Sequence, residues 1–170
     1  MQHDPVRVEE ARALLVKASE DLRASAHDLT AVPPLLMDSP FHSQQASEKA
    51  IKAFLVWHDR PFRKTHSLEE IGEQCLGIDV SLRSLIDEAA PLTAYASAFR
   101  YPGEQDEPTI EETEEAFAFL DVGAVPTLLY DEAEHPALRK TFSSREHIFW
   151  GDAFPEEKED ARLFYSHRTF

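Results

Sequence analysis

Residues 41–55 read FHSQQASEKAIKAFL, and this stretch decides the fold. Its apolar residues recur at the three- and four-residue spacing of a helix, which we expect to run from about Pro40 to His58. They cover a broad surface, which suits either a central helix or a helix shared with a partner chain. These residues are Phe41, Ala46, Ala50, Ile51, Phe54, Leu55 and Trp57.

The ends of the expected helices are marked by residues that start or stop helical geometry. Pro33-Pro34 stops the preceding helix, and Asp59-Arg60-Pro61 ends the central one, because proline disfavours helical geometry in the residue before it. Asp38-Ser39-Pro40 supplies a cap side chain and a proline suited to the first turn. Ser67 has the Ser-x-x-Glu spacing of a capping box, and Pro91 is a candidate kink. Four other helices are expected, from about Val8 to Leu29, Ser67 to Gly77, Val80 to Phe99 and Thr109 to Asp121. Thr109 is the expected cap of the last one.

Length and composition bound the architecture. A chain of 170 residues is long enough for one core, and only five glycines among many alanines, leucines and glutamates favour helix over an all-β fold. The predicted fold class is therefore all-α, an up-and-down bundle of four to five helices with a C-terminal extension. We place the bundle in residues 1–122 and the extension, which has no clear helical pattern, in residues 123–170.

The charge balance disfavours anionic partners. Seventeen lysines and arginines face 32 aspartates and glutamates, which gives a formal net charge of −15. This average field repels long nucleic acids and anionic membranes. We find no apolar run long enough to span a membrane and no leader-like start, so we expect a cytoplasmic protein.

Neither a metal nor a cofactor is expected. Cys75 is the only cysteine, so a thiolate zinc cluster and an intrachain disulfide are ruled out, and we interpret it as a small packing residue. No His-x-x-x-His pair falls on an expected helix, and there is no glycine-rich phosphate loop or nucleophile elbow.

One segment departs from the acidic average. Between residues 49 and 66 only Asp59 opposes a group of basic residues. Lys49 and Lys52 share one helical face and could meet a phosphate together with Arg63, Lys64 and His66 of the following loop. The alternative is that the lysines form a solvated face and His66 caps or packs the next helix.

The quoted stretch resembles the signature of the HEPN domain. Gln44-Gln45-Ala46-Ser47-Glu48-Lys49-Ala50-Ile51-Lys52-Ala53 is followed by a short loop and Thr65-His66-Ser67-Leu68, in the order typical of that family. Arg100-Tyr101-Pro102 also looks like this family. The resemblance covers roughly Glu10 to Leu120 and leaves out the C-terminal extension.

The resemblance implies a helical bundle, frequent dimerisation and two kinds of function. Some members bind nucleotides beside a minimal nucleotidyltransferase, whereas others are metal-independent ribonucleases that use an arginine and a histidine separated by about four to six residues. Arg100 stands where that arginine would be, and we add it to the candidate anion-binding residues. The positions that require histidine, however, hold Glu104, Gln105, Asp106 and Glu107.

The spacing of the ribonuclease motif alone decides nothing. Arg60 to His66 and Arg162 to His167 both satisfy it, but roughly one or two matches are expected by chance in this composition. The first match also contains Pro61, which makes it a loop rather than a helix end.

Three functions follow from these patterns. The first is a homodimeric module that binds a nucleotide or another anion and partners a minimal nucleotidyltransferase in a toxin–antitoxin-like pair. The second is a metal-independent RNA endonuclease, and the third is a structural interaction protein.

Overall fold

The structure is a computed structural model that describes residues 4–97 and 107–119. In these ranges every regular element is helical, as predicted. The elements are α1 (Pro5–Thr30), α2 (Asp38–Trp57), α3 (Leu68–Leu76), the 3-10 turn η1 (Val80–Leu82), α4 (Arg83–Ala89), the 3-10 segment η2 (Ala90–Ala96) and α5 (Ile110–Phe119). None of the described helices has the length and apolarity needed to cross a membrane.

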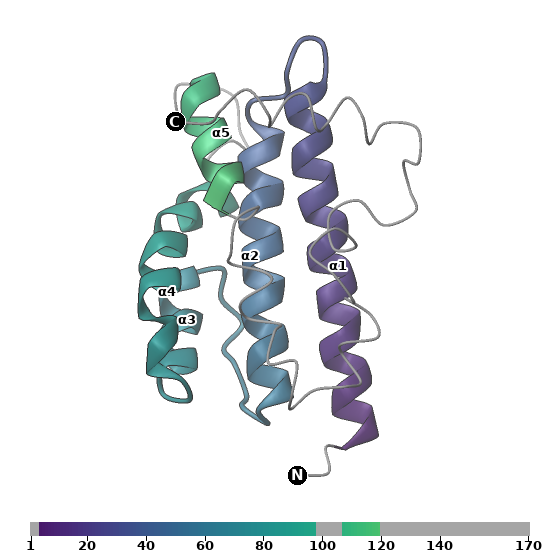
Figure 1. Cartoon of the computed structure of the whole chain (residues 1–170), viewed down its shortest axis with the longest axis vertical. Helices are drawn as coiled ribbons and strands as arrows, with labels where there is room; N and C mark the ends of the chain where they lie inside the picture. The colour runs from purple at the N-terminus through teal and green to yellow at the C-terminus, as the bar shows by residue number, and fades with distance from the viewer. Residues whose placement is uncertain (1–3, 98–106, 120–170) are drawn as a thin grey trace.

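The two longest helices, α1 and α2, lie side by side and antiparallel along the long axis of the molecule (Figure 1). On the other side of α2 lie α3 and α4, and α5 packs near the end where α1 connects to α2 (Figure 1). α2 contacts α1, α3, η2 and α5, so it is the central helix of the bundle.

The central position explains the broad apolar surface of α2. Its small residues Ala46, Ala50 and Ala53 are at most 2% exposed, which allows close approach of helices on several sides. α1 presents a single stripe to it at helical spacing, made of Ala11, Leu15, Ala18, Leu22 and Ser25. The central position of α2 in the bundle of one chain is therefore sufficient to explain its broad apolar surface, without a partner chain.

The start of α2 differs from the prediction. Asp38 is the first helical residue rather than the cap, the cap position is Met37, and no side chain caps the helix. Ser39 is fully buried and its Oγ lies 2.9 Å from Ser25 Oγ of α1, which lies 2.8 Å from Ser43 Oγ. The polar residues at this end therefore join α1 to α2 instead of capping α2.

The helix expected from Val80 to Phe99 is not continuous. It is divided into η1, α4 and η2, and the described helical geometry ends at Ala96. Pro91 lies at the start of η2, where it supplies no backbone N–H for an α-helical hydrogen bond. Its effect is thus to change the helix type, and not only to kink one helix.

The predicted caps of α3 and α5 are confirmed. Ser67 Oγ accepts a hydrogen bond from the backbone N–H of Glu70. The Glu70 carboxylate accepts from Arg63 rather than from the Ser67 N–H, so only half of the capping box forms at α3. At α5 the box is complete, because Thr109 Oγ1 accepts from Glu112 N–H and Glu112 Oε2 accepts from Thr109 N–H.

Candidate functional site

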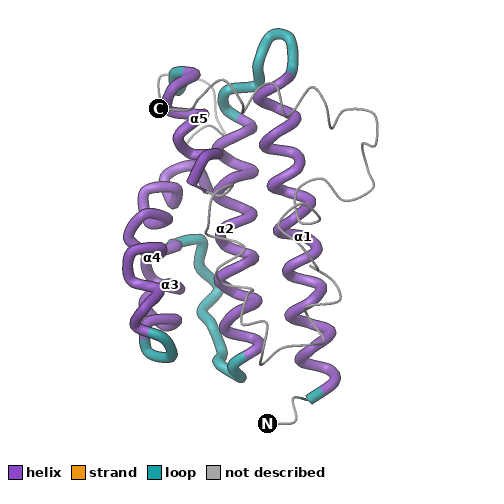
Figure 2. Tube along the Cα trace, in the orientation of Figure 1, coloured by secondary structure: helices purple, strands orange, loops and turns teal. Residues whose placement is uncertain are grey.

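The basic segment singled out from the sequence includes the α2–α3 loop, residues 58–67, which runs back along α2 (Figure 2). Phe62 is half-buried and packs against the core, and Lys52 Nζ lies 5.2 Å from the centre of its ring. A cation at this distance from an aromatic face is attracted to it. The loop is therefore attached to α2 by both apolar and charged contacts.

Glu48 is the centre of these contacts. Its Oε1 accepts from Lys52 Nζ at 2.6 Å, and its Oε2 lies 3.0 Å from both Gln44 Nε2 and His66 Nδ1. The same donors reach the loop backbone, since Lys52 Nζ donates to Thr65 O and Gln44 Nε2 to His66 O, both at 3.2 Å. We call these five residues the Glu48 cluster.

The Glu48 cluster keeps its carboxylate ionised. Burial alone would raise the pKa of Glu48, which is 6% exposed, but hydrogen bonds from Lys52, Gln44 and His66 outweigh burial and lower the pKa below its usual value. An ionised carboxylate accepts hydrogen bonds and cannot donate them. His66 therefore carries its proton on Nδ1, and its Nε2 lies on the opposite edge of the ring.

Lys49 belongs to a different contact. Its Nζ lies 2.5 Å from Asp21 Oδ2 of α1 and 3.0 Å from Gln45 Oε1. Gln45 Nε2 in turn donates to Gln44 Oε1 at 2.7 Å, which links this pair to the Glu48 cluster. Although Lys49 and Lys52 are three residues apart, the ammonium group of Lys49 pairs with a carboxylate of α1 and that of Lys52 with a carboxylate of α2 itself.

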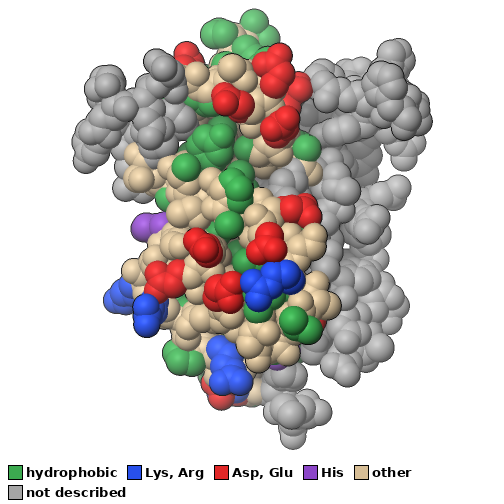
Figure 3. All heavy atoms as spheres, turned by 90° about the vertical axis from the view of Figure 1, so that its left-hand side faces the viewer, with side chains coloured by type: hydrophobic (Ala, Val, Ile, Leu, Met, Phe, Trp, Pro, Cys, Tyr) green, Lys and Arg blue, Asp and Glu red, His purple; other side chains and the backbone are tan. Residues whose placement is uncertain are grey.

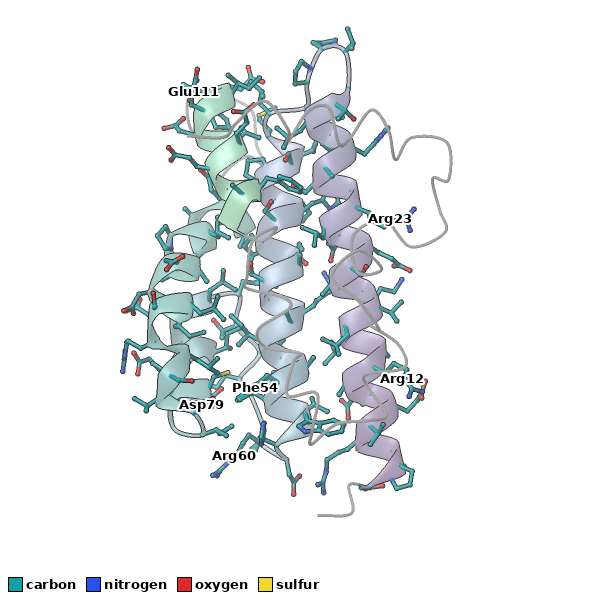
Figure 4. The ribbon with its side chains drawn as sticks, viewed as in Figure 1. Arg12, Arg23, Phe54, Arg60, Asp79 and Glu111 are labelled. Atoms are coloured by element: carbon teal, nitrogen blue, oxygen red, sulfur yellow. The ribbon has the colours of Figure 1, made fainter. Side chains whose placement is uncertain are left out.

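The loop cations are more exposed than the two lysines. The side chains of Arg63 and His66 are 80% and 63% exposed, against 25% for Lys49 and 14% for Lys52. Arg63 forms an exposed ion pair with Glu70 at 2.8 Å. Lys64 is exposed and forms no ion pair with another described residue. Arg60 extends from the same loop, at the end of α2 (Figure 4).

Of the candidate residues, Arg63, Lys64 and His66 therefore lie on one loop, Lys52 contacts this loop from α2, and Lys49 pairs with α1 instead. Arg100 and the Arg162 to His167 match lie outside the described residues. The sequence interpretation missed Glu48 and Asp21 as partners of the lysines. The signal for Glu48 was local, because Gln44, Glu48 and Lys52 follow one another at four-residue steps on one helical face.

A second group of titratable residues lies between α1 and α2. His42 Nδ1 lies 3.5 Å from Asp21 Oδ1, and His42 Nε2 lies 3.9 Å from Asp28 Oδ2. Burial raises the pKa of Asp28, while the nearby His42 lowers it less. Although the group has three such residues, no arrangement that could hold a metal ion is found within the described ranges.

Cys75 has no role in this chemistry. It is fully buried in the core, and burial raises the pKa of its thiol to about 12. A thiol that stays protonated at neutral pH is a poor nucleophile. The structure thus agrees with its interpretation as a packing residue.

Comparison with models of known protein families yields a match. The family model described as HEPN domain matches residues 11–121, close to the range over which the sequence resembled that family. No curated protein and no solved structure matches the chain.

Proposed function

Because this chain belongs to the HEPN domain family, we propose that it is a binding module for a nucleotide or another phosphate-bearing anion. In this proposal the ligand contacts Arg63, Lys64 and His66 of the α2–α3 loop. Lys49 and Lys52 act from behind, because their ion pairs with Asp21 and Glu48 hold the helix and loop in place. Arg100 remains a further candidate contact.

The observation that carries the proposal is the orientation of His66. Glu48, itself buried and held by Gln44 and Lys52, fixes Nδ1 of an imidazole that is 63% exposed, so that Nε2 is presented to solvent. An imidazole with a fixed orientation loses less conformational entropy on binding than a free side chain, and its Nε2 donates to an anion when both ring nitrogens carry a proton. Arg63 and Lys64 add local positive charge to a chain with a net charge of −15, where an anion needs such an exception.

The cellular setting is proposed from the family resemblance. We propose that the module partners a minimal nucleotidyltransferase in a toxin–antitoxin-like pair in the cytoplasm, and that it forms a homodimer. Since α2 is surrounded by elements of its own chain, the dimer would have to use another surface. Light scattering on the purified chain tests this point, because a dimer has twice the 19.3 kDa mass of the chain.

The anion-binding proposal is tested by thermal unfolding with ATP and with inorganic phosphate at low salt, where charge pairing is least screened. A ligand present at about one hundred times its Kd stabilises the folded state by about 2.7 kcal/mol. Changing Arg63 and Lys64 together to Ala should remove most of this gain.

The matched control changes Arg83 and Lys17 together to Ala. These two cations are also exposed, and Arg83 forms a similar 2.8 Å ion pair, with Glu73. The control should keep the ligand-induced gain. An equal gain in both double variants would contradict the proposed site.

A second candidate function, metal-independent RNA cleavage, is favoured by one observation. A histidine oriented by a carboxylate has the arrangement of a general base, and Arg60 and Arg63 lie on the same loop to stabilise a charged phosphate. The test is cleavage of single-stranded RNA in the presence of a chelator. Activity that is lost in His66→Gln and kept in His3→Gln would favour this function over simple binding.

A further inference from the structure

The end of the bundle where α1 connects to α2 carries exposed apolar side chains. Val32 is 98% exposed, and Leu35, Met37 and Ile110 are 42–43% exposed. Thr113 Oγ1 of α5 has two acceptors, Thr109 O of its own helix at 2.9 Å and Leu36 O at 3.2 Å, and the second links the first turns of α5 to the α1–α2 connection. The four residues therefore lie at one end of the molecule, and we call them the apolar end.

The apolar end is more than scattered exposure. The other large apolar residues that are exposed in the described ranges are Val6, Val16 and Val80, which lie separately on α1 and η1. Single exposed apolar residues are normal on a soluble protein, whereas a group of them marks an interaction surface.

The surroundings of the apolar end are acidic. Glu111, Glu112 and Glu115 of α5 are exposed beside it, and Asp38 is exposed at the start of α2. No lysine or arginine occurs in residues 24–48 or 107–119. Figure 3 shows this end with hydrophobic and acidic side chains next to one another, whereas lysine and arginine side chains are visible only lower on this face.

We propose that the apolar end binds a basic amphipathic segment of a partner protein. The partner's apolar side chains would pack on Val32, Leu35, Met37 and Ile110, and its lysines or arginines would meet the glutamates of α5. Complementary charge around an apolar centre favours such a partner and speeds its association. A nucleic acid or an anionic membrane does not fit, because its phosphates would meet carboxylates.

A second copy of this chain does not fit either. A two-fold contact places the same patch on both sides, so the glutamates of one copy would face those of the other. Like charges placed together at an interface oppose association. This surface is also separate from the proposed anion site, because the hydrogen bonds of the α2–α3 loop to α2 come no closer to Met37 than Gln44, and seven residues of helix span about 10 Å.

The experiment measures binding of the full-length chain to a fluorescent 14-residue peptide of leucine and lysine, patterned as an amphipathic helix. The expected result is a micromolar Kd that rises with salt, and at least tenfold weaker binding of a peptide in which glutamate replaces lysine. Changing Leu35 and Met37 together to Asp should weaken binding at least tenfold. The matched control changes Val6 and Val80 together to Asp, and it should bind as the unchanged chain does.

The acidic border is tested separately. Changing Glu111 and Glu115 together to Gln should weaken binding severalfold and reduce its salt dependence, while the same change at the exposed Glu10 and Glu69 should do neither. Circular dichroism confirms that each variant is folded. The proposal is overturned if the full-length chain does not bind the lysine peptide, or if the Leu35 and Met37 variant binds it unchanged. It is also overturned if that variant turns a dimer into a monomer, since a second copy would then be the occupant.

Discussion

Glu48→Ala tests the central contact of the site. The side chains of Glu48 and Lys52 are 7% and 14% exposed, so their 2.6 Å ion pair is largely shielded from solvent. Removing one partner of a buried pair costs about 3–5 kcal/mol, because the other charge is left without compensation. In this variant Lys52 still has its hydrogen bond to Thr65 O and its contact with the Phe62 ring, which keep the loss at the lower end of this range. We therefore expect a loss of about 3 kcal/mol in the free energy of unfolding, measured by urea unfolding with circular dichroism.

The double variant Glu48→Ala with Lys52→Ala separates the ion pair from mere loss of packing. With both charges removed, the double variant should lose less stability than the sum of the single losses, with a coupling energy of about 1–3 kcal/mol. The control is Glu69→Ala, an exposed glutamate at the start of α3, which should change stability by less than about 0.5 kcal/mol. A loss below about 1 kcal/mol for Glu48→Ala, or strictly additive losses, would refute the reasoning.

The same contact has a defined pH dependence. The pKa of Glu48 is lowered in the folded state from its ordinary value of 4.5. A lowered carboxylate pKa contributes stability that is fully present above that ordinary value and is lost as the pH falls through the folded value. The difference in stability between the unchanged chain and Glu48→Ala should therefore be constant near neutral pH and shrink below about pH 4.5.

Three further substitutions test the core and the seam between α1 and α2, each by urea unfolding. Ser25→Ala should lower the free energy of unfolding by about 1–3 kcal/mol, because it leaves the buried hydroxyls of Ser39 and Ser43 without their shared partner. Ser47→Ala should change it little, because the Ser47 hydroxyl bonds only within its own helix. Gly72→Ala should cost about 1–3 kcal/mol, since the new Cβ would lie 2.4 Å from an isoleucine side chain of α4, while Gly77→Ala, with 3.4 Å to its nearest neighbour, should be tolerated. Asp28→Asn should stabilise the chain at pH 7 by about 1 kcal/mol or less, because burial penalises the carboxylate. This gain should vanish as the pH falls through the raised pKa of Asp28. A variant that is less stable than the unchanged chain at pH 7 would contradict this prediction.

The fold was largely predictable because short-range sequence patterns determine the helices of the bundle. Helical spacing of apolar residues located α1, α2, α3 and α5 to within a few residues, and Ser67 and Thr109 marked the starts of two of them. Local patterns were less informative about the segment from Val80 to Ala96. Its apolar stripe suits an α-helix and a 3-10 helix almost equally over one or two turns. Pro91 predicts a change in helical geometry, but it does not predict whether the helix kinks or becomes a 3-10 helix.

The site was less predictable because an ion pair depends on groups that the local pattern does not contain. The segment from residue 49 to 66 looked strongly basic, but Glu48, one residue before it, lies one helical turn from Lys52 and neutralises it. That partner could have been read from the four-residue step alone. Asp21 could not, because it reaches Lys49 from 28 positions away and only the packing of α1 on α2 brings them together. A basic segment in a helical bundle is therefore a candidate anion site only where its cations stay exposed. Lys49 and Lys52 are mostly buried in their ion pairs. On the loop, Arg63 is 80% exposed although it pairs with Glu70 of α3, and Lys64 forms no ion pair with another described residue.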